Sequence, residues 1–236
     1  MRDRYQLVTF DMGLTLVHME PFAQILGDVC REHRISAELE RLQAAVDVVW
    51  RDVLAADATA AFETTPSASR AWWRNVNLRT LEAAGLPVER WDALEARFMV
   101  LLDDPASYAV FPDVIGTLGA LRQAGYRLGV ISNWGWNLPD LCREWGLDTY
   151  FDFVLPSSRV GCAKPNPRIF RQALHLAGVE AGAALHVGDS LYADVGGARS
   201  AGMDALFLNR TAEPAPGDTP TIRNLTELLA LLDLGG

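Results

Sequence analysis

Lysine is almost absent from this chain of 236 residues. Of its 21 basic residues, 20 are arginines, and Lys164 is the one lysine. Lysine offers a compact ammonium and arginine a planar guanidinium, so the two are not interchangeable at a site built around one of them. A single lysine kept among so many arginines therefore points to position 164 as a place that needs a compact positive charge.

Cysteine and long apolar runs are also scarce. The three cysteines, Cys30, Cys142 and Cys162, are widely spaced and lack metal-ligand spacing, which favours reduced thiols in a cytosolic protein. No apolar run is long enough to cross a bilayer, and the run near the N-terminus is too short for a signal peptide. We therefore expect a cytoplasmic protein without a membrane partner.

Positive charge is in deficit as well, since 30 acidic residues face 21 basic ones and the formal net charge is −9. Affinity for nucleic acid depends mostly on clustered Lys and Arg, so we expect no nucleic-acid partner. A small anionic substrate stays compatible with this charge, because a local positive site can lie inside an acidic protein. Nothing in the sequence predicts the oligomeric state.

The spacing of apolar residues changes along the chain. Residues 5–10 form a short buried-strand pattern, residues 20–98 show apolar positions at helical spacing, and from about residue 107 strands and helices alternate. Such alternation predicts a parallel sheet covered by helices on both faces. The sequence thus predicts an α/β fold: a Rossmann-like core of residues 1–17 and 107–236, with an inserted helical cap of residues 18–106.

Polar side chains stand where the predicted strands end. Asp11 follows the first strand, Ser132 and Asn133 follow a later one, and Asp189 follows another, while Lys164 precedes a helix. Ligands of such sheets bind at the carboxyl ends of the strands. Hard carboxylate oxygens suit Mg²⁺, and hydroxyl, amide and ammonium donors suit phosphate oxygens. The pattern therefore predicts a metal site that binds a phosphate.

At these positions the chain resembles the haloacid dehalogenase-like (HAD) hydrolases. Four segments match the four motifs of that family in order and spacing: FDMGLTL, VISN, AKPNPRIF and VGDSLYADVGGARSAGM. The resemblance covers essentially the whole predicted core. The helical insertion is similar to the cap of the subgroup that includes the dehalogenases and many small phosphatases, and RAWWRNVNLRTLEAAG looks closest to rhythmically expressed gene 2-like proteins.

The resemblance implies a reaction and a role for each candidate residue. Asp11 would attack phosphorus and form an aspartyl-phosphate, Thr15 would orient it, and Lys164 would neutralise charge between the two anions. Ser132 and Asn133, together with Lys164, would bind the phosphoryl group. Mg²⁺ would be held by Asp11, the backbone carbonyl of Gly13, Asp189 and Asp194. The implied function is a Mg²⁺-dependent phosphatase acting on a small phosphorylated metabolite.

Gly13 departs from the family pattern, because most of its phosphatases carry there a second Asp that protonates the leaving oxygen. General acid catalysis contributes roughly 10²–10⁴-fold, so we expect alkyl phosphates to be hydrolysed badly. Two alternatives stay open: a phosphate-binding protein with little turnover, and a 2-haloacid dehalogenase. Dehalogenation is disfavoured, since the carboxylate of Asp189 near Asp11 would repel a carboxylate substrate unless a cation lay between them.

Several other residues have both a structural and a functional interpretation. Trp72 and Trp73 either pack the cap or reach the substrate together with Arg70, Arg74 or Asn77, whereas Trp134 and Trp136 follow Asn133 and are placed to crowd the site. Two histidines also have such interpretations. His186 is predicted to be a core residue whose ring nitrogens are hydrogen-bonded, and His18 is a candidate to replace the missing acid.

Overall fold

A parallel sheet is the centre of the fold. The computed structural model describes residues 4–57, 60–211 and 217–234. Within these residues six strands pair in the order β5-β4-β1-β6-β7-β8. Their bounds are β1 Leu7–Phe10, β4 Arg127–Ser132, β5 Phe153–Pro156, β6 Ala184–Gly188, β7 Asp204–Leu208 and β8 Thr221–Ile222, and every pairing is parallel.

Strand β1 lies in the middle of the sheet, where the strand order reverses. Leu7 pairs with Arg127 of β4 on one side and with Ala184 of β6 on the other. The chain runs from β1 to β4 and β5 on one side, and it then crosses to β6, β7 and β8 on the opposite side. Such a reversal opens a crevice at the carboxyl ends of the central strands, so the residue that follows β1 stands at the expected ligand site.

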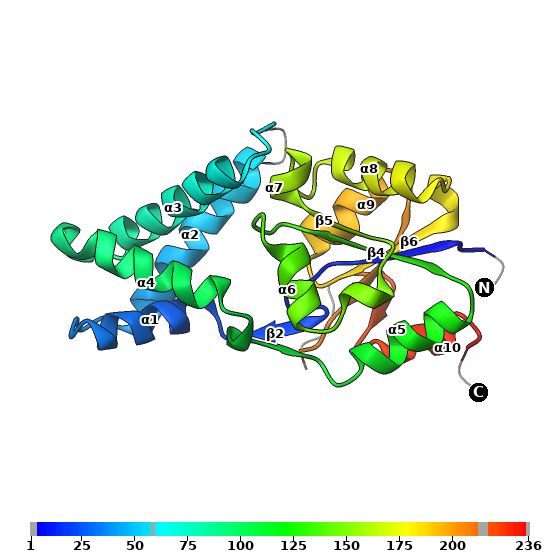
Figure 1. The fold of residues 1–236 in the computed structure, drawn as a ribbon, viewed down its shortest axis with the longest axis horizontal. Coiled ribbons are helices and arrows are strands. Elements are labelled where there is room, and N and C mark those ends of the chain that lie inside the picture. Colours follow the sequence, from blue (N-terminus) through cyan, green and yellow to red (C-terminus); the bar gives the residue numbers. More distant parts are fainter. Residues whose placement is uncertain (1–3, 58–59, 212–216, 235–236) are drawn as a thin grey trace.

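Helices cover both faces of the sheet (Figure 1). Alternate side chains of β1 point to opposite faces: Val8 and Phe10 belong to the apolar cluster that includes α5 (Val114–Gln123), α6 (Leu138–Glu144) and α10 (Thr226–Leu231). Leu7 belongs instead to the cluster with α8 (Pro167–Ala177) and α9 (Gly197–Ser200). The strands are therefore buried on both faces, as a parallel sheet requires.

Four helices form a separate apolar cluster beside the sheet (Figure 1): α1 Phe22–Glu32, α2 Leu39–Asp57, α3 Pro66–Ala83 and α4 Trp91–Asp103. Helix α3 begins at Pro66 because Thr65 caps it, its Oγ1 accepting from the Ala68 amide at 3.1 Å. An α/β fold with a parallel sheet and an inserted helical cap is thus confirmed.

A short antiparallel ribbon joins the cap helices to the sheet. Strand β2 (Val17–Met19) pairs with β3 (Tyr108–Val110), Val17 facing Val110. Strands of three residues are too short for a period-two pattern, which is why the sequence predicts neither. The predicted domain division at residues 17/18 falls inside β2, the division at 106/107 falls just before β3, and both stay predictions. Residues 1–3, 58–59, 212–216 and 235–236 of the predicted domains lie outside the described part.

Three further elements differ from the sequence prediction. The short helix α7 (Ser157–Val160) follows β5 directly, and β8 extends the sheet by a two-residue strand. The predicted helix after β6 begins instead as a π-helical turn, Leu191–Gly196, before the short helix α9. Such turns are frequent at functional sites, because the wider i→i+5 bonding changes the direction of side chains.

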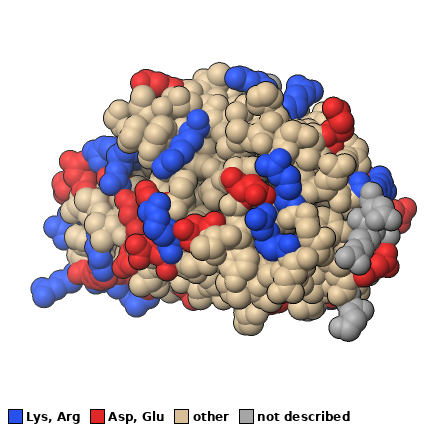
Figure 2. Space-filling view, turned by 45° about the vertical axis from the view of Figure 1, so that its right-hand side comes forward, with Lys and Arg blue, Asp and Glu red and all other residues tan. Residues whose placement is uncertain are grey.

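Acidic and basic side chains alternate on the face drawn in Figure 2, where most blue groups lie beside red ones. Several of these charges form ion pairs in the described chain, as between Arg97 and Glu32 at 2.7 Å. Among the described residues, no helix has the length and apolar character needed to cross a membrane. The predicted absence of a nucleic-acid partner and the cytoplasmic location stay predictions.

One largely buried ion pair fixes the loop after β1. Arg210, which follows β7, donates to both oxygens of Asp113 at 3.0 Å and to the carbonyl of Thr15 at 2.8 Å. Its guanidinium lies 3.8 Å from the ring centroid of Phe111. Asp113 also accepts from the Leu225 amide at 2.7 Å. A single side chain thus connects the loop after β1 with the entry to α5.

Replacing Asp113 with Ala is expected to lower the free energy of unfolding by about 3 kcal/mol, because it leaves the largely buried Arg210 charge unpaired. Chemical denaturation measures this change. Asp52→Ala is the matched control: its pair with Arg79 is exposed at 59% and 41% of the two side chains, and its loss should cost less than about 1 kcal/mol. Equal effects of the two substitutions would contradict the role of the buried pair.

Candidate active site

Asp11 is the first residue after β1 and is buried. Its amide donates to the Val187 carbonyl of β6 at 2.9 Å, so the strand pairing holds its backbone in place. The chain then turns tightly, with the amides of Leu16 and Val17 donating to the Met12 carbonyl at 2.9 and 3.0 Å. Burial of the Met12 and Leu16 side chains fixes this turn and directs the Asp11 carboxylate into the crevice.

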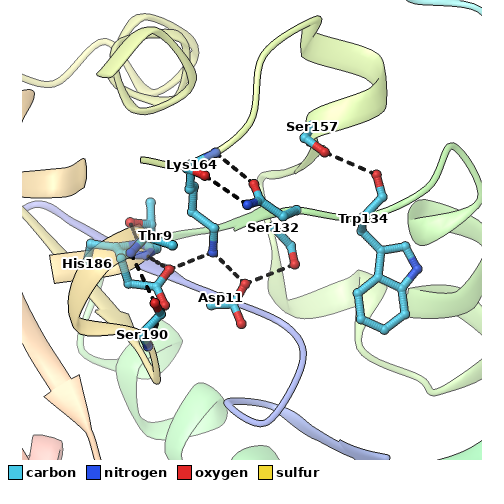
Figure 3. A network of polar contacts seen from close by, with 11 residues as sticks. Thr9, Asp11, Ser132, Trp134, Ser157, Lys164, His186 and Ser190 are labelled. Carbon is cyan, nitrogen blue, oxygen red and sulfur yellow. Dashed lines mark hydrogen bonds and ion pairs between the residues drawn. The ribbon is translucent and has the colours of Figure 1, made fainter. Parts of the chain in front are cut away.

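Lys164 lies between two carboxylates (Figure 3). Its Nζ donates to Oδ1 of Asp11 at 2.5 Å and to Oδ1 of Asp194 at 2.6 Å, and the residue is only 2% exposed. The lysine stands just before α8, whose start is fixed by Pro167 and by Asn166, the side chain of which accepts from the Arg168 amide at 3.0 Å. The one lysine of the chain is therefore the buried counter-ion of this site.

Asp194 is held from three sides. Besides the bond to Lys164, its Oδ2 accepts from the Ser190 amide at 2.9 Å, and its Oδ1 lies 3.1 Å from His186 Nε2. A Cβ on Gly188 would come within 2.3 Å of the Asp194 carboxyl carbon. Only glycine therefore leaves room for this carboxylate, a steric requirement that the sequence pattern did not reveal.

His186 is the satisfied core residue that the sequence analysis expected. It is fully buried in β6, and its Nδ1 lies 2.9 Å from Thr9 Oγ1. Burial lowers the pKa of His186 despite the neighbouring Asp194, so the ring is neutral at physiological pH. Nε2–H then donates to Asp194, and Nδ1 accepts from the Thr9 hydroxyl. The histidine orients Asp194 from beneath the site, a function that the sequence analysis missed.

Ser132, the last residue of β4, and Asn133, which follows it, make different contacts. Ser132 Oγ donates to Asp11 Oδ1 at 2.9 Å. Asn133 clasps the main chain of Lys164 instead: its Nδ2 donates to the Lys164 carbonyl at 2.9 Å, and its Oδ1 accepts from the Lys164 amide at 2.7 Å. Its predicted side-chain contact with phosphate would have to share or replace these bonds, so the structure favours a positioning role for this side chain.

Thr15 is placed differently from the expectation. Its hydroxyl is buried and has no hydrogen-bond partner in the described part of the chain, so it does not orient Asp11 through a hydrogen bond. The Thr15 carbonyl accepts from Arg210 instead. Ser132 and Lys164 supply the contacts that hold Asp11.

Three carboxylates converge at the floor of the crevice. One oxygen each of Asp11, Asp189 and Asp194 lies within 4.8 Å of the others. Burial and the charges of Asp11 and Asp194 raise the pKa of Asp189 to about 8. Burial also raises the pKa of Asp11, against the opposing effect of Lys164.

Asp194 and Lys164, the other two charged groups at the floor of the crevice, are paired with each other. Burial would raise the pKa of Asp194, but the Lys164 ammonium and the His186 bond lower it below its usual range. Burial would likewise lower the pKa of Lys164, but the carboxylates of Asp11 and Asp194 raise it. With all three carboxylates ionised, one ammonium leaves two negative charges uncompensated. Hard oxygen donors with this charge suit a divalent cation such as Mg²⁺, so the residues present fit the predicted metal.

A pocket of about 810 Å³ lies between this floor and the cap. Its core side includes Asp11, Gly13, Ser132, Asn133, Lys164, Asp189 and Asp194. A Cβ on Gly13 would meet Trp134 Cζ3 at 3.5 Å, an ordinary contact distance. All predicted site residues except Thr15 therefore line one pocket. Position 13, where most phosphatases of the family carry the second Asp, has room for a Cβ beside Trp134.

The cap side of the pocket is largely aromatic and apolar. Of the cap residues singled out in the sequence, Trp73 and Arg70 line it, as do Trp134 and Trp136 of the core. Trp72, Arg74 and Asn77 do not line it. The sequence analysis missed the other aromatic lining residues, which are Phe22, Trp50 and Tyr108, because helical packing patterns do not show which apolar side chains face a cavity.

His18 is not a lining residue of this pocket; its ring packs edge-on against Phe111 at 5.9 Å. His18 is exposed, whereas Asp11 is buried. The proposal that it replaces the missing acid therefore has no structural support.

Comparisons with known proteins agree on one family. Residues 5–202 match the model of the haloacid dehalogenase-like hydrolases. The mouse haloacid dehalogenase-like hydrolase domain-containing protein 3 is 33% identical, over 99% of this chain and 96% of its own length. A phosphoserine phosphatase from Thermus thermophilus is 31% identical, over 92% of this chain and 94% of its own length.

A solved structure shows the same similarity. The crystal structure of a 2-haloacid dehalogenase from Pseudomonas syringae pv. Tomato DC3000 is 30% identical, superposes with a TM-score of 0.67, and covers 97% of this chain and 98% of that one. With phosphatases and dehalogenases alike among these relatives, the chain is an enzyme that catalyses hydrolysis, and it belongs to the haloacid dehalogenase-like hydrolase family.

Proposed function

We propose that this hydrolase is a Mg²⁺-dependent phosphatase that works through an aspartyl-phosphate on Asp11. The observation that carries the proposal is the buried ammonium of Lys164, bonded to Asp11 at 2.5 Å and to Asp194 at 2.6 Å, with Asp189 beside them. An anionic nucleophile can attack an anionic phosphate only where fixed positive charge offsets their repulsion. Lys164 supplies part of that charge at the nucleophile itself.

The hydrogen bonds indicate which atom of Asp11 reacts. Oδ1 accepts from both Ser132 and Lys164, while Oδ2 accepts from no described residue. Oδ2 is therefore the oxygen free to attack phosphorus, and the phosphorus–oxygen bond to the leaving group then breaks. Water next attacks phosphorus, releasing phosphate and restoring the Asp11 carboxylate.

Mg²⁺ would be held by Asp11, Asp189 and the carbonyl of Gly13, and when bound it supplies the charge that Lys164 alone does not. Both oxygens of Asp194 already accept hydrogen bonds, from Lys164, His186 and the Ser190 amide. Asp194 therefore serves more as the support of Lys164 than as a metal ligand, which refines the predicted ligand set.

The relatives support phosphate esters as substrates. The Thermus protein bears the name of a phosphoserine phosphatase. For this chain we infer a small phosphorylated substrate, with turnover limited to esters that leave without the acid missing at Gly13. A second candidate is dehalogenation, favoured by the 30% identical dehalogenase structure and by Gly13, since halide needs no proton on leaving. Halide release from a 2-haloacid in the presence of a chelator would support it.

Asp11→Asn should abolish hydrolysis of acetyl phosphate in Mg²⁺, with kcat falling roughly 10³-fold or more because the nucleophile is lost. Phosphate release measures this. Asp52→Asn, the same change on the cap surface, is the control and should keep wild-type kcat. Equal activity of Asp11→Asn and wild type would refute the nucleophile.

Mg²⁺ should raise the melting temperature of the wild type, since at 100 times its Kd a ligand stabilises by about 2.7 kcal/mol. Asp189→Asn should lose most of that increase. Without metal, the same variant should melt at a higher temperature than the wild type, because it removes a carboxyl group whose ionisation is opposed by burial and by the charges of Asp11 and Asp194. Scanning calorimetry with and without Mg²⁺ measures both effects; an unchanged Mg²⁺ response would contradict the ligand assignment.

Gly13→Asp tests whether only the acid is missing. A Cβ at position 13 would lie at an ordinary contact distance of 3.5 Å from Trp134 Cζ3. We expect kcat/KM for glycerol 2-phosphate, an alkyl ester, to rise roughly 10²–10⁴-fold while acetyl phosphate changes little. No gain on the alkyl ester would leave the phosphate-binding protein as the better interpretation.

A further inference from the structure

We propose that the preferred substrates are aryl phosphate monoesters whose ring carries no negative charge. The inference rests on the proposed function and adds the leaving group. Three independent features of the pocket lead to it: its aromatic walls, the scarcity of free positive charge, and the absence of an acid at position 13.

The aromatic walls come from both domains. In the cap, the Phe22 and Trp73 rings are stacked at 6.4 Å with an interplanar angle of 23°, and Trp50 lies 5.8 Å from Trp73. In the core, Trp134 lies 5.4 Å from the ring of Tyr108. All five side chains line the same pocket. A planar ring can therefore contact aromatic faces on the cap side and on the core side at once.

The two aromatic groups meet at the loop after β4. A Cβ on Gly135 would come within 3.1 Å of Trp73 Nε1, so the cap indole reaches the residue next to Trp134. The Trp136 amide donates to Ser69 Oγ of the cap at 3.2 Å. At about 810 Å³ the pocket lies in the range of pockets for drug-sized ligands, well beyond the needs of a three-carbon phosphate.

Positive charge in the pocket is already engaged. Among the described lining residues, Lys164 and Arg70 are the only cations. Arg70 donates to Asp103 at 2.8 Å in a pair whose side chains are 59% and 39% exposed, and Asp103 also accepts from Asn137 at 2.9 Å. Asp140 is a further acidic lining residue. With five lining carboxylates (Asp11, Asp103, Asp140, Asp189 and Asp194) against these two cations, the pocket disfavours a carboxylate on the leaving group and does not repel a neutral or cationic ring.

The leaving group must depart without help from residue 13. Tyr108, a lining residue with a hydroxyl, donates to the Leu102 carbonyl at 2.8 Å, and burial raises its pKa well above the usual range. A phenol has a pKa of about 10, as tyrosine has, whereas that of water, close to an aliphatic alcohol, is about 15.7. Phenolate therefore leaves unprotonated far more readily than alkoxide.

The reaction needs no reactant besides the ester and water. Asp11 Oδ2 forms the bond to phosphorus, and the aryl oxygen departs with the electron pair as phenolate, which takes a proton from solvent. Water then attacks phosphorus and yields phosphate and the free Asp11 carboxylate. The aromatic walls thus bind a class of ester that can react without the missing acid.

The test compares kcat/KM in Mg²⁺ for 1-naphthyl phosphate, phenyl phosphate, 4-carboxyphenyl phosphate, glycerol 2-phosphate and acetyl phosphate. We expect naphthyl above phenyl phosphate, 4-carboxyphenyl phosphate below phenyl phosphate despite its better leaving group, and glycerol 2-phosphate lowest by roughly 10²-fold or more. Acetyl phosphate has a good leaving group without a ring, so its hydrolysis tests the proposed phosphatase activity independently of the aryl preference.

Two tryptophans of the cap give a matched pair of variants. Trp73→Leu should lower the ratio of kcat/KM for naphthyl over acetyl phosphate about tenfold, mainly through KM, the size of a lost aromatic contact. Trp91 of helix α4 donates its Nε1–H to the Leu86 carbonyl at 3.0 Å and does not line the pocket, so Trp91→Leu should leave the ratio unchanged. Melting temperatures verify that both variants fold.

The outcomes separate the two proposals. Two results would overturn the aryl preference while hydrolysis of acetyl phosphate still supports the phosphatase. One is an equal kcat/KM for glycerol 2-phosphate and phenyl phosphate. The other is an equal change, in both tryptophan variants, of the kcat/KM ratio of naphthyl over acetyl phosphate. Failure of the wild type to hydrolyse acetyl phosphate in Mg²⁺ would overturn the phosphatase itself.

Discussion

The buried ammonium of Lys164 is the interaction on which the site depends. It joins Asp11, which follows β1, to Asp194, which follows β6, and it is 2% exposed. Without it, two buried carboxylates would face each other beside a third, an arrangement that costs far more than it contributes to stability. Its neighbours serve to hold it: Asn133 clasps its main chain, and His186 orients its partner Asp194.

The fold supports this ion pair network through the backbone. Residues that end β1, β4 and β6 converge because parallel strands end at one edge of the sheet, and the order reverses at β1. The loop after β1 is fixed from below by Arg210 and its pair with Asp113. Catalytic geometry of this kind needs rigid elements beneath it and a movable boundary above it, and the β2–β3 ribbon is the described link between sheet and cap.

Much of this arrangement could be predicted from the sequence, and the limits have physical causes. Strand–helix alternation predicts the parallel sheet, and strand ends predict that Asp11, Ser132 and Asp189 lie together. The clasp of Asn133 on Lys164, the orphaned hydroxyl of Thr15 and the support from His186 depend on side-chain directions that no residue pattern encodes. The aromatic lining was hidden for a similar reason, since Phe22, Trp50 and Trp73 come from three helices whose periodicity predicts burial but not what they are buried against.

The covalent intermediate is the most direct test of the account. Enzyme mixed with excess phenyl phosphate and Mg²⁺ is quenched in acid within one turnover, and the peptides are mapped by mass spectrometry. The account predicts phosphate on the Asp11 side chain during turnover and its disappearance once substrate is exhausted. Phenol release without phosphate on Asp11, or with phosphate on another residue, would contradict it.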